Sequence, residues 1–357
     1  MEQKHKGKKS WKWVLEDNSI IFAVLSLIGG AATLFINIMH FTEGSKPWWE
    51  VLAQVIVLLF FALALVLFVQ KNRRLTIQLE TKHLPVCFVV NKTAEEAQSN
   101  FNLLKKAVTE LTGFSAFDKI EGFTSRSNCL IPHERNRLPS DMLKWKGYIA
   151  DSIQSIRSFA NGVPETKIYH IAVDGPITLS LGLGAVFGTK HPLVFYHYDG
   201  VGYTPVLNLT EGVRRVKAHL PAEHQYQYFK ISYPETYTSD LAVVLGGASH
   251  EAPAKVRQYL KAQGINMSIA VIDNTYGGNL TEKDWLVPVQ ELFSIFHNLS
   301  KNEAVVRFHL FYSMPVAFGF GLGMALGTFL PVTLYNWEAT PATYYPVLKL
   351  NELGVSF

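Results

Sequence analysis

The hydrophobic positions of the chain are unevenly distributed, and two uninterrupted apolar runs lie near its beginning. Residues 20–39 and 51–69 contain no charged side chain. Each run is long enough to cross a bilayer as a helix, since about 20 residues span ~30 Å of hydrocarbon. The first run exceeds the ~7–15 apolar residues of a signal peptide, and the second follows closely. We therefore predict a two-helix transmembrane region at 1–74, with spans at about 18–41 and 49–70.

Basic residues flank this predicted hairpin on both sides. Five lysines lie among residues 4–12 and three basic residues among 71–74, whereas the connecting loop contains only Glu43 and Lys46. Positively charged flanks remain on the cytoplasmic side of a membrane. The pattern thus predicts a multi-pass protein with both termini in the cytoplasm and residues 75–357 inside the cell.

Two glycine-rich segments, GLGAVFGTKHP at 182–192 and GLGMALGTFLP at 321–331, repeat the same order of small residues. Each glycine of the second segment lies 139 residues beyond its counterpart (321 − 182 = 139), and flanking residues such as His170 and His309 match as well. Such internal similarity indicates a duplicated unit. Residues 311–335 also lack charge, but their earlier counterpart contains charged residues, so we interpret both as buried core.

Strand-like and helix-like patterns alternate around each glycine-rich segment. The predicted strands lie at 85–90, 168–173, 192–198, 203–209, 241–246, 306–312, 331–337 and 344–350. The predicted helices lie at 94–111, about 141–160, 251–263 and about 283–300, and each glycine-rich segment adds another. This alternation is typical of a mostly parallel sheet with helices on both faces. After the transmembrane helical hairpin we therefore expect an α/β region of two fused Rossmann-like halves with mostly parallel sheets, at about 75–215 and 216–357.

The glycine spacing resembles a dinucleotide-binding fingerprint, which requires glycines in the turn directly after a strand. Gly182 and Gly321 instead lie six residues inside a predicted helix that begins near Pro176 or Pro315. We interpret these glycines as small residues on one helix face that let two backbones, or a helix and a sheet, approach closely. A membrane-anchored enzyme that uses a dinucleotide cofactor remains the alternative interpretation.

Motifs of catalysis and metal binding are absent from the sequence. It contains no P-loop, HExxH, G-x-S-x-G or CxxC motif. Its two cysteines, Cys87 and Cys129, provide neither a disulfide framework nor metal-ligand spacing. His170 and His309 occupy matched strand positions, where we expect structural roles. The formal net charge of +4 does not indicate binding of duplex nucleic acid. We expect no enzyme activity, no metal and no cofactor.

The two strand-to-helix junctions are the candidate ligand-binding positions. They are Asp174-Gly175-Pro176 and Ser313-Met314-Pro315. Open α/β folds bind ligands at the carboxyl edge of the sheet, where helix N-termini attract phosphate groups. A role limited to capping the helices is the alternative for both junctions.

The recurring strand, proline, glycine-rich helix and aromatic strand, seen in MPVAFGFGLGMALG, VTLYNWE and YYPVLKL, resemble the SAVED family. That family comprises sensors of bacterial cyclic-oligonucleotide antiphage signalling (CBASS), built from two fused halves related to the CARF fold. The resemblance covers residues 145–357 well and 85–145 weakly. The two apolar runs make this chain similar to transmembrane members of the family, and imply an effector of the bacterial inner membrane.

The resemblance implies a cyclic di- or trinucleotide ligand, made by a partner nucleotidyltransferase, that drives self-association and disruption of the lipid membrane. The outcome expected for the cell is growth arrest or death. Aromatic faces stack on bases, which makes Tyr198 and Trp337 stacking candidates, although core packing explains them equally well. Arg135 and Arg137, with Arg126, lie in a polar loop that either covers a phosphate or is simply solvated. The implied ligand-binding residues are Asn91, Lys92, Thr93, Arg135, Arg137, Asp174, Gly175, Pro176, Tyr198, His250, Tyr276, Ser313, Met314, Pro315 and Trp337.

Overall fold

A computed structural model of the 357-residue chain separates it into two compact units, Met1–Thr81 and Lys82–Phe357. Apart from isolated helical positions between residues 30 and 70, it describes 81–90, 93–113, 130–131, 141–163, 166–220, 225–246, 252–276, 284–354 and 357. Both predicted spans lie largely outside these residues. Among the residues that are described, no helix has the length and apolar character needed to cross a membrane.

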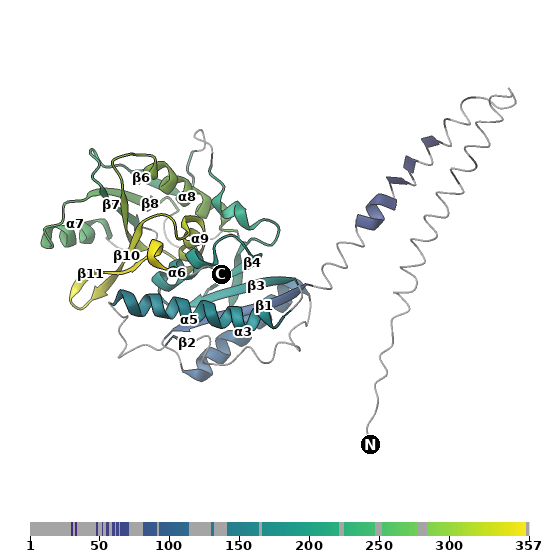
Figure 1. Cartoon of the computed structure of the whole chain (residues 1–357), viewed down its shortest axis with the longest axis horizontal. Helices are drawn as coiled ribbons and strands as arrows, with labels where there is room; N and C mark the ends of the chain where they lie inside the picture. The colour runs from purple at the N-terminus through teal and green to yellow at the C-terminus, as the bar shows by residue number, and fades with distance from the viewer. Residues whose placement is uncertain are drawn as a thin grey trace, which may run out of the picture. The chain divides into compact units, whose positions relative to one another are not determined.

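The first half of the second unit is built on a five-stranded sheet in the order β2-β1-β3-β4-β5 (Figure 1). All neighbouring pairs are parallel except β4 and β5, which form an antiparallel hairpin. The strands are β1 (Lys82–Val90), β2 (Leu130–Ile131), β3 (Lys167–Asp174), β4 (Leu193–Tyr198) and β5 (Tyr203–Asn208). The sequence therefore placed β1 and β3 correctly.

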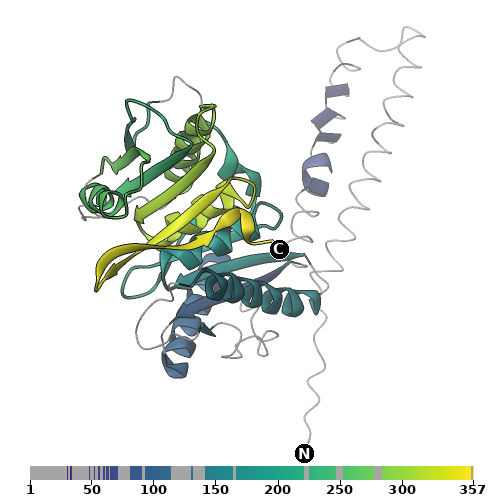
Figure 2. The same cartoon turned by 60° about the vertical axis from the view of Figure 1, so that its left-hand side comes forward.

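The second half repeats this plan with a six-stranded sheet in the order β11-β10-β9-β7-β8-β6. Its four central strands are parallel, and β6 and β11 are antiparallel edges. The strands are β6 (Phe229–Ser232), β7 (Asp240–Gly246), β8 (Ser268–Asn274), β9 (Arg307–Ser313), β10 (Val332–Ala339) and β11 (Ala342–Lys349). Figure 2 shows the β10–β11 hairpin, in yellow, projecting from the side of this sheet. The prediction of two mostly parallel sheets is confirmed.

Six described helices longer than two turns connect and cover these sheets. They are α3 (Ala94–Thr112), α5 (Met142–Asn161), α6 (Ile177–Phe187), α7 (Ala252–Ala262), α8 (Leu286–Ser300) and α9 (Val316–Leu326), with short 3₁₀ turns at Val213–Lys217 and Leu350–Glu352. Local signals set their ends: Thr93 and Glu96 form a capping box on α3, and Gly113 ends that helix with φ 69°. The predicted helix boundaries agree with the structure to within about three residues.

The two glycine-rich helices, α6 and α9, pack directly against each other at the centre of the unit. A Cβ built on Gly184 would collide with the Phe320 carbonyl oxygen and lie 3.0 Å from the carbonyl carbon. The reciprocal contact is made by Gly323, whose Cβ would collide with the Leu181 carbonyl oxygen. Only a residue without Cβ permits backbones to approach this closely. The interpretation of these glycines as packing residues is confirmed, and they are not a dinucleotide-binding turn.

The matched histidines tie the middle strand of each sheet to its neighbours. His170 Nδ1 lies 2.8 Å from the Tyr196 hydroxyl, and its Nε2 lies 2.8 Å from His83 Nδ1. In the second sheet His309 bridges Tyr335 and Asp240, each at 2.9 Å. Both histidines are satisfied inside the fold, as a structural role requires.

Candidate functional site

The N-termini of α6 and α9 form the centre of the candidate site. Each helix starts directly after its strand. Pro176 is the N-cap residue of α6 and Pro315 that of α9, so each proline lies one position before the first residue of its helix. Proline has no side-chain acceptor, so neither helix has a side-chain cap for the N–H groups of its first turn. The partial positive charge at such an end attracts anions.

Contacts between the first turns show that the two N-termini lie together. Ser180 Oγ donates a hydrogen bond of 2.8 Å to the Val316 carbonyl oxygen. A Cβ on Gly319 would lie 2.9 Å from the Ile177 side chain. The duplicated halves thus bring two anion-attracting helix ends to one place, which we call the paired-terminus face. It comprises Asp174–Ser180 and Ser313–Gly319.

Different polar groups border this face in the two halves. Asp174, the last residue of β3, accepts a 2.6 Å hydrogen bond from Asn100 Nδ2 of α3. Ser313, its counterpart at the end of β9, is paired in the sheet with Gly246. A Cβ on Gly246 would lie 2.6 Å from Asp273 Oδ1, so a carboxylate approaches the backbone closely here. Asn100 carries no signal in the sequence that would distinguish it from other polar residues on a helix surface.

A polar cluster that joins the two halves lies beside the face. Thr178, in the first turn of α6, contacts both Tyr312 of β9 and Asn336 of β10 through its hydroxyl. Tyr312 also donates to Asn336 Oδ1 at 2.7 Å, and burial raises the pKa of Tyr312, which keeps it a neutral donor. Within the described part of the chain, Asn336 Nδ2 is buried with no hydrogen-bond partner. Such a donor costs about 1–3 kcal/mol while unmet, so a polar ligand or water that meets it gains that interaction.

The two stacking candidates lie at matched strand ends and keep partial exposure. Tyr198 is 38% exposed, and its hydroxyl donates to the Gly200 carbonyl oxygen at 3.0 Å. Trp337 is 37% exposed, with Lys255 Nζ 5.0 Å from its ring centroid. A lysine over an indole face forms a cation–π contact and places a positive charge beside the partly exposed ring. Lys255 carries no signal in the sequence that would distinguish it from other lysines.

Several of the predicted site residues have other roles or cannot be placed. Thr93 caps α3 by accepting a hydrogen bond from Glu96 N at 3.2 Å. Met314 is only 8% exposed and belongs to the hydrophobic core, so it packs beneath the face. Tyr276 packs edge-on against Phe229. Gly175 remains at the junction, next to Asp174. The other predicted residues, Asn91, Lys92, Arg135, Arg137 and His250, lie outside the described residues.

The described cavities do not coincide with the paired-terminus face. One, of about 410 Å³, lies at the opposite edge of the first sheet, where β3 begins. Another, of about 330 Å³, lies at the C-terminal ends of α8 and α9. We place the candidate site at the paired helix ends, because they concentrate partial positive charge contributed by both halves. In the described ranges, no three His, Cys, Asp or Glu side chains gather as metal ligands do.

The fold and this face define a class: a duplicated α/β protein in which the two halves pack together through their glycine-rich helices. The model of the SMODS-associated and fused to various effectors sensor domain, SAVED, matches residues 152–350, more than half of the chain. The chain therefore belongs to the SAVED family.

Solved structures of SAVED/CARF-domain receptors resemble the chain at low identity. The Acinetobacter baumannii Cap4 receptor with the cyclic trinucleotide 3′3′3′-cAAA is 14% identical, with TM-score 0.47, and the match covers 92% of this chain and 78% of that one. The same receptor with 2′3′3′-cAAA gives 15% identity, TM-score 0.46, and coverage of 71% and 62%. Moraxella osloensis Cap4 gives 14% identity, TM-score 0.43, and coverage of 71% and 60%. The chain thus spans less than two thirds of the receptor solved with 2′3′3′-cAAA. No curated protein matches the chain.

Proposed function

We propose that this SAVED protein is a non-enzymatic receptor that binds a cyclic di- or trinucleotide at the paired-terminus face. The observation that carries the proposal is the meeting of two uncapped helix N-termini, joined by the bond from Ser180 to Val316. A cyclic oligonucleotide presents phosphates at fixed spacing around a ring, and two adjacent helix ends offer two anion sites. Cap4 receptors of the same family have been solved with cyclic trinucleotides, which supports this ligand class.

Base recognition in this proposal falls to the groups around the face. Trp337, with Lys255 beside it, and Tyr198 offer ring surfaces at the two strand ends. Stacking of this kind contributes about 1–3 kcal/mol per base. Asn336 Nδ2 supplies a buried donor. A partner nucleotidyltransferase would supply the ligand in a CBASS antiphage system.

The proposed output lies in the N-terminal region. The two charge-free runs at 20–39 and 51–69 support a membrane hairpin with both termini in the cytoplasm of a bacterial cell. Ligand binding would assemble copies of the chain and concentrate their hairpins, which then disrupt the lipid bilayer and stop growth. A reporter fused after Phe357 should be active only if it functions in the cytoplasm; activity of a periplasmic reporter at that position would contradict the topology.

Binding is tested by isothermal titration of the full chain in detergent with a panel of cyclic di- and trinucleotides. Trp337→Ala removes a ring, Asn336→Leu removes the buried donor, and Ser313→Trp blocks the β9 junction. Each variant should bind at least about tenfold more weakly, the effect of losing ~1.4 kcal/mol. Phe329→Ala, at a position that is 90% exposed in the loop after α9, is the control and should bind like the wild type. Wild-type affinity in all three site variants would place the ligand elsewhere.

A further inference from the structure

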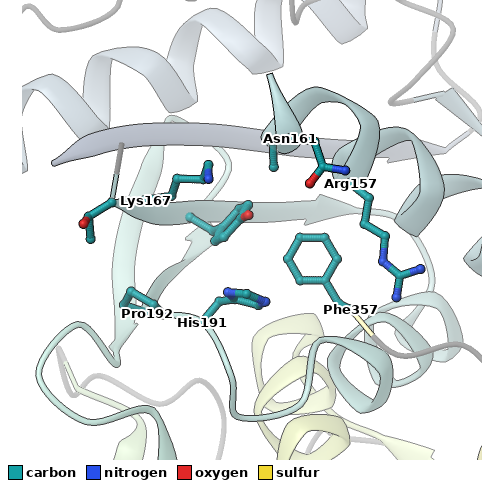
Figure 3. Close-up of a pocket in the computed structure, with 9 residues that line it drawn as sticks. Arg157, Asn161, Lys167, His191, Pro192 and Phe357 are labelled. Carbon is teal, nitrogen blue, oxygen red and sulfur yellow. The ribbon is translucent and has the colours of Figure 1, made fainter. Parts of the chain in front are cut away.

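The cavity at the amino edge of the first sheet is separate from the paired-terminus face. It has a volume of about 410 Å³. The end of α5 forms one wall, the start of β3 forms another, and His191, Pro192 and Phe357 close the remaining side. In Figure 3, Lys167 and Arg157 lie at opposite ends of the cavity, with the rings of His191 and Phe357 between them.

The charged side chains around this cavity are positive. Arg157 and Lys167 line it, and none of its nine lining side chains is acidic. Among the residues that the structure describes, neither Arg157 nor Lys167 forms an ion pair. The pKa of His191 is lowered mainly by burial. The positive charges of Lys190 and Lys167 lower it further. An anionic ligand would therefore be attracted from either end.

An aromatic wall accompanies these charges. The ring centroids of Tyr169 and Phe357 are 5.2 Å apart, and those of His191 and Phe357 are 5.0 Å apart. Burial raises the pKa of Tyr169 to about 12, so its hydroxyl stays neutral. Asn161 and Thr166 add amide and hydroxyl groups at the rim. Rings, cations and polar groups around one hollow match a ligand that has a flat base, a sugar and a phosphate.

We propose that this cavity is a second ligand site, which binds a nucleoside monophosphate with its base against the Tyr169–His191–Phe357 wall and its phosphate at Lys167 or Arg157. A cavity of 410 Å³ is at the small end of the ~300–1,000 Å³ range of ligand pockets. That volume suits a single nucleotide better than a ring of three. This cavity does not depend on the proposed cyclic-nucleotide site at the paired-terminus face, because the cavity lies at the opposite edge of the sheet.

The test is titration of the full chain with AMP and GMP, alongside adenosine and inorganic phosphate. A monophosphate should bind saturably. Adenosine and phosphate should each bind at least about tenfold more weakly, because adenosine lacks the phosphate and inorganic phosphate lacks the base. Lys167→Ala and Arg157→Ala should together lower monophosphate affinity at least about tenfold. Lys146→Ala, on an exposed position of α5 three turns from Arg157, is the matched control and should leave affinity unchanged.

Nucleotide binding at this cavity and cyclic-nucleotide binding at the paired-terminus face can fail independently. The second site would be overturned if neither monophosphate bound saturably. It would also be overturned if inorganic phosphate bound as tightly as AMP, or if the double variant bound AMP like the wild type. A cyclic trinucleotide should not compete with AMP, and Trp337→Ala should bind AMP normally. If competition is complete, the two ligands share one site and this proposal is wrong. Unliganded melting temperatures of the variants should match the wild type.

Discussion

Adding one methyl group at Gly184 tests whether the contact between α6 and α9 holds the two halves together. In Gly184→Ala the new Cβ would meet backbone atoms of α9, including the Met324 nitrogen at 3.1 Å. Backbone atoms cannot rotate away as a side chain does, so the two buried helices must separate. Forced overpacking costs about 1–3 kcal/mol and occasionally more, and we expect the upper end here. The helical preference of Ala over Gly returns about 1 kcal/mol, which leaves a net loss of about 2 kcal/mol.

Gly147 on α5 provides the matched control for this substitution. It also lies inside a helix, but nothing lies within 4 Å of a Cβ built there. Gly147→Ala should therefore stabilise the protein by about 1 kcal/mol. Chemical denaturation followed by tryptophan fluorescence measures both changes, since Trp285 stacks on Phe318 of α9 with ring centroids 4.8 Å apart. A Gly184→Ala protein as stable as the wild type would refute the close packing of α6 on α9.

Three further predictions concern the polar groups of the fold. Burial first, and His83 second, lower the pKa of His170 to about 3, so its neutral form contributes stability that is complete above about pH 6.5 and is lost as the pH falls. Between pH 7 and 5 the wild type should lose about 2 kcal/mol more unfolding free energy than His170→Gln, and an equal loss would contradict this. The hydrogen bonds of Arg307 hold the pKa of Asp240 at about 2, below its value in the unfolded chain. The stability that they provide should therefore persist down to about pH 4 and decline below it. In acid denaturation, Asp240→Asn should flatten this decline. Thr178→Val should destabilise the protein by about 1–3 kcal/mol, and a double-mutant cycle with Asn336→Leu should give a coupling energy clearly above zero; simple additivity would show that the cluster does not connect the halves.

The regular elements and the duplication were predictable because they depend on patterns local to the sequence. Apolar runs bounded by Pro and Gly identify β3 and β9, and Thr93 followed by Glu96 marks the start of α3. The role of the glycines followed from their position inside a helix. Edge strand β6 and the two-residue strand β2 were missed, because their pairing depends on partners far along the chain.

The polar groups at the site were not predictable, since the two copies differ where the halves meet. Counting 139 residues forward, Thr178 corresponds to Ala317, so the contact of Thr178 with Tyr312 and Asn336 has no repeated signature. The amino-edge cavity likewise combines residues from α5, β3 and position 357.

Divergence of the two copies has a consequence for recognition. The packing glycines Gly184 and Gly323 are the same in both halves, which preserves the adjacent helix ends. The bordering groups differ. In the first half Asp174 accepts a hydrogen bond from Asn100, whereas the residue that matches Asp174 in the second half is Ser313, which is paired with Gly246. A ring of repeating phosphates would meet matched helix ends but unmatched side chains. Under the proposed function, the backbone of the face would hold the ring while the unmatched side chains distinguish its bases. The order of the bases around the ring should then affect affinity more than the number of phosphates.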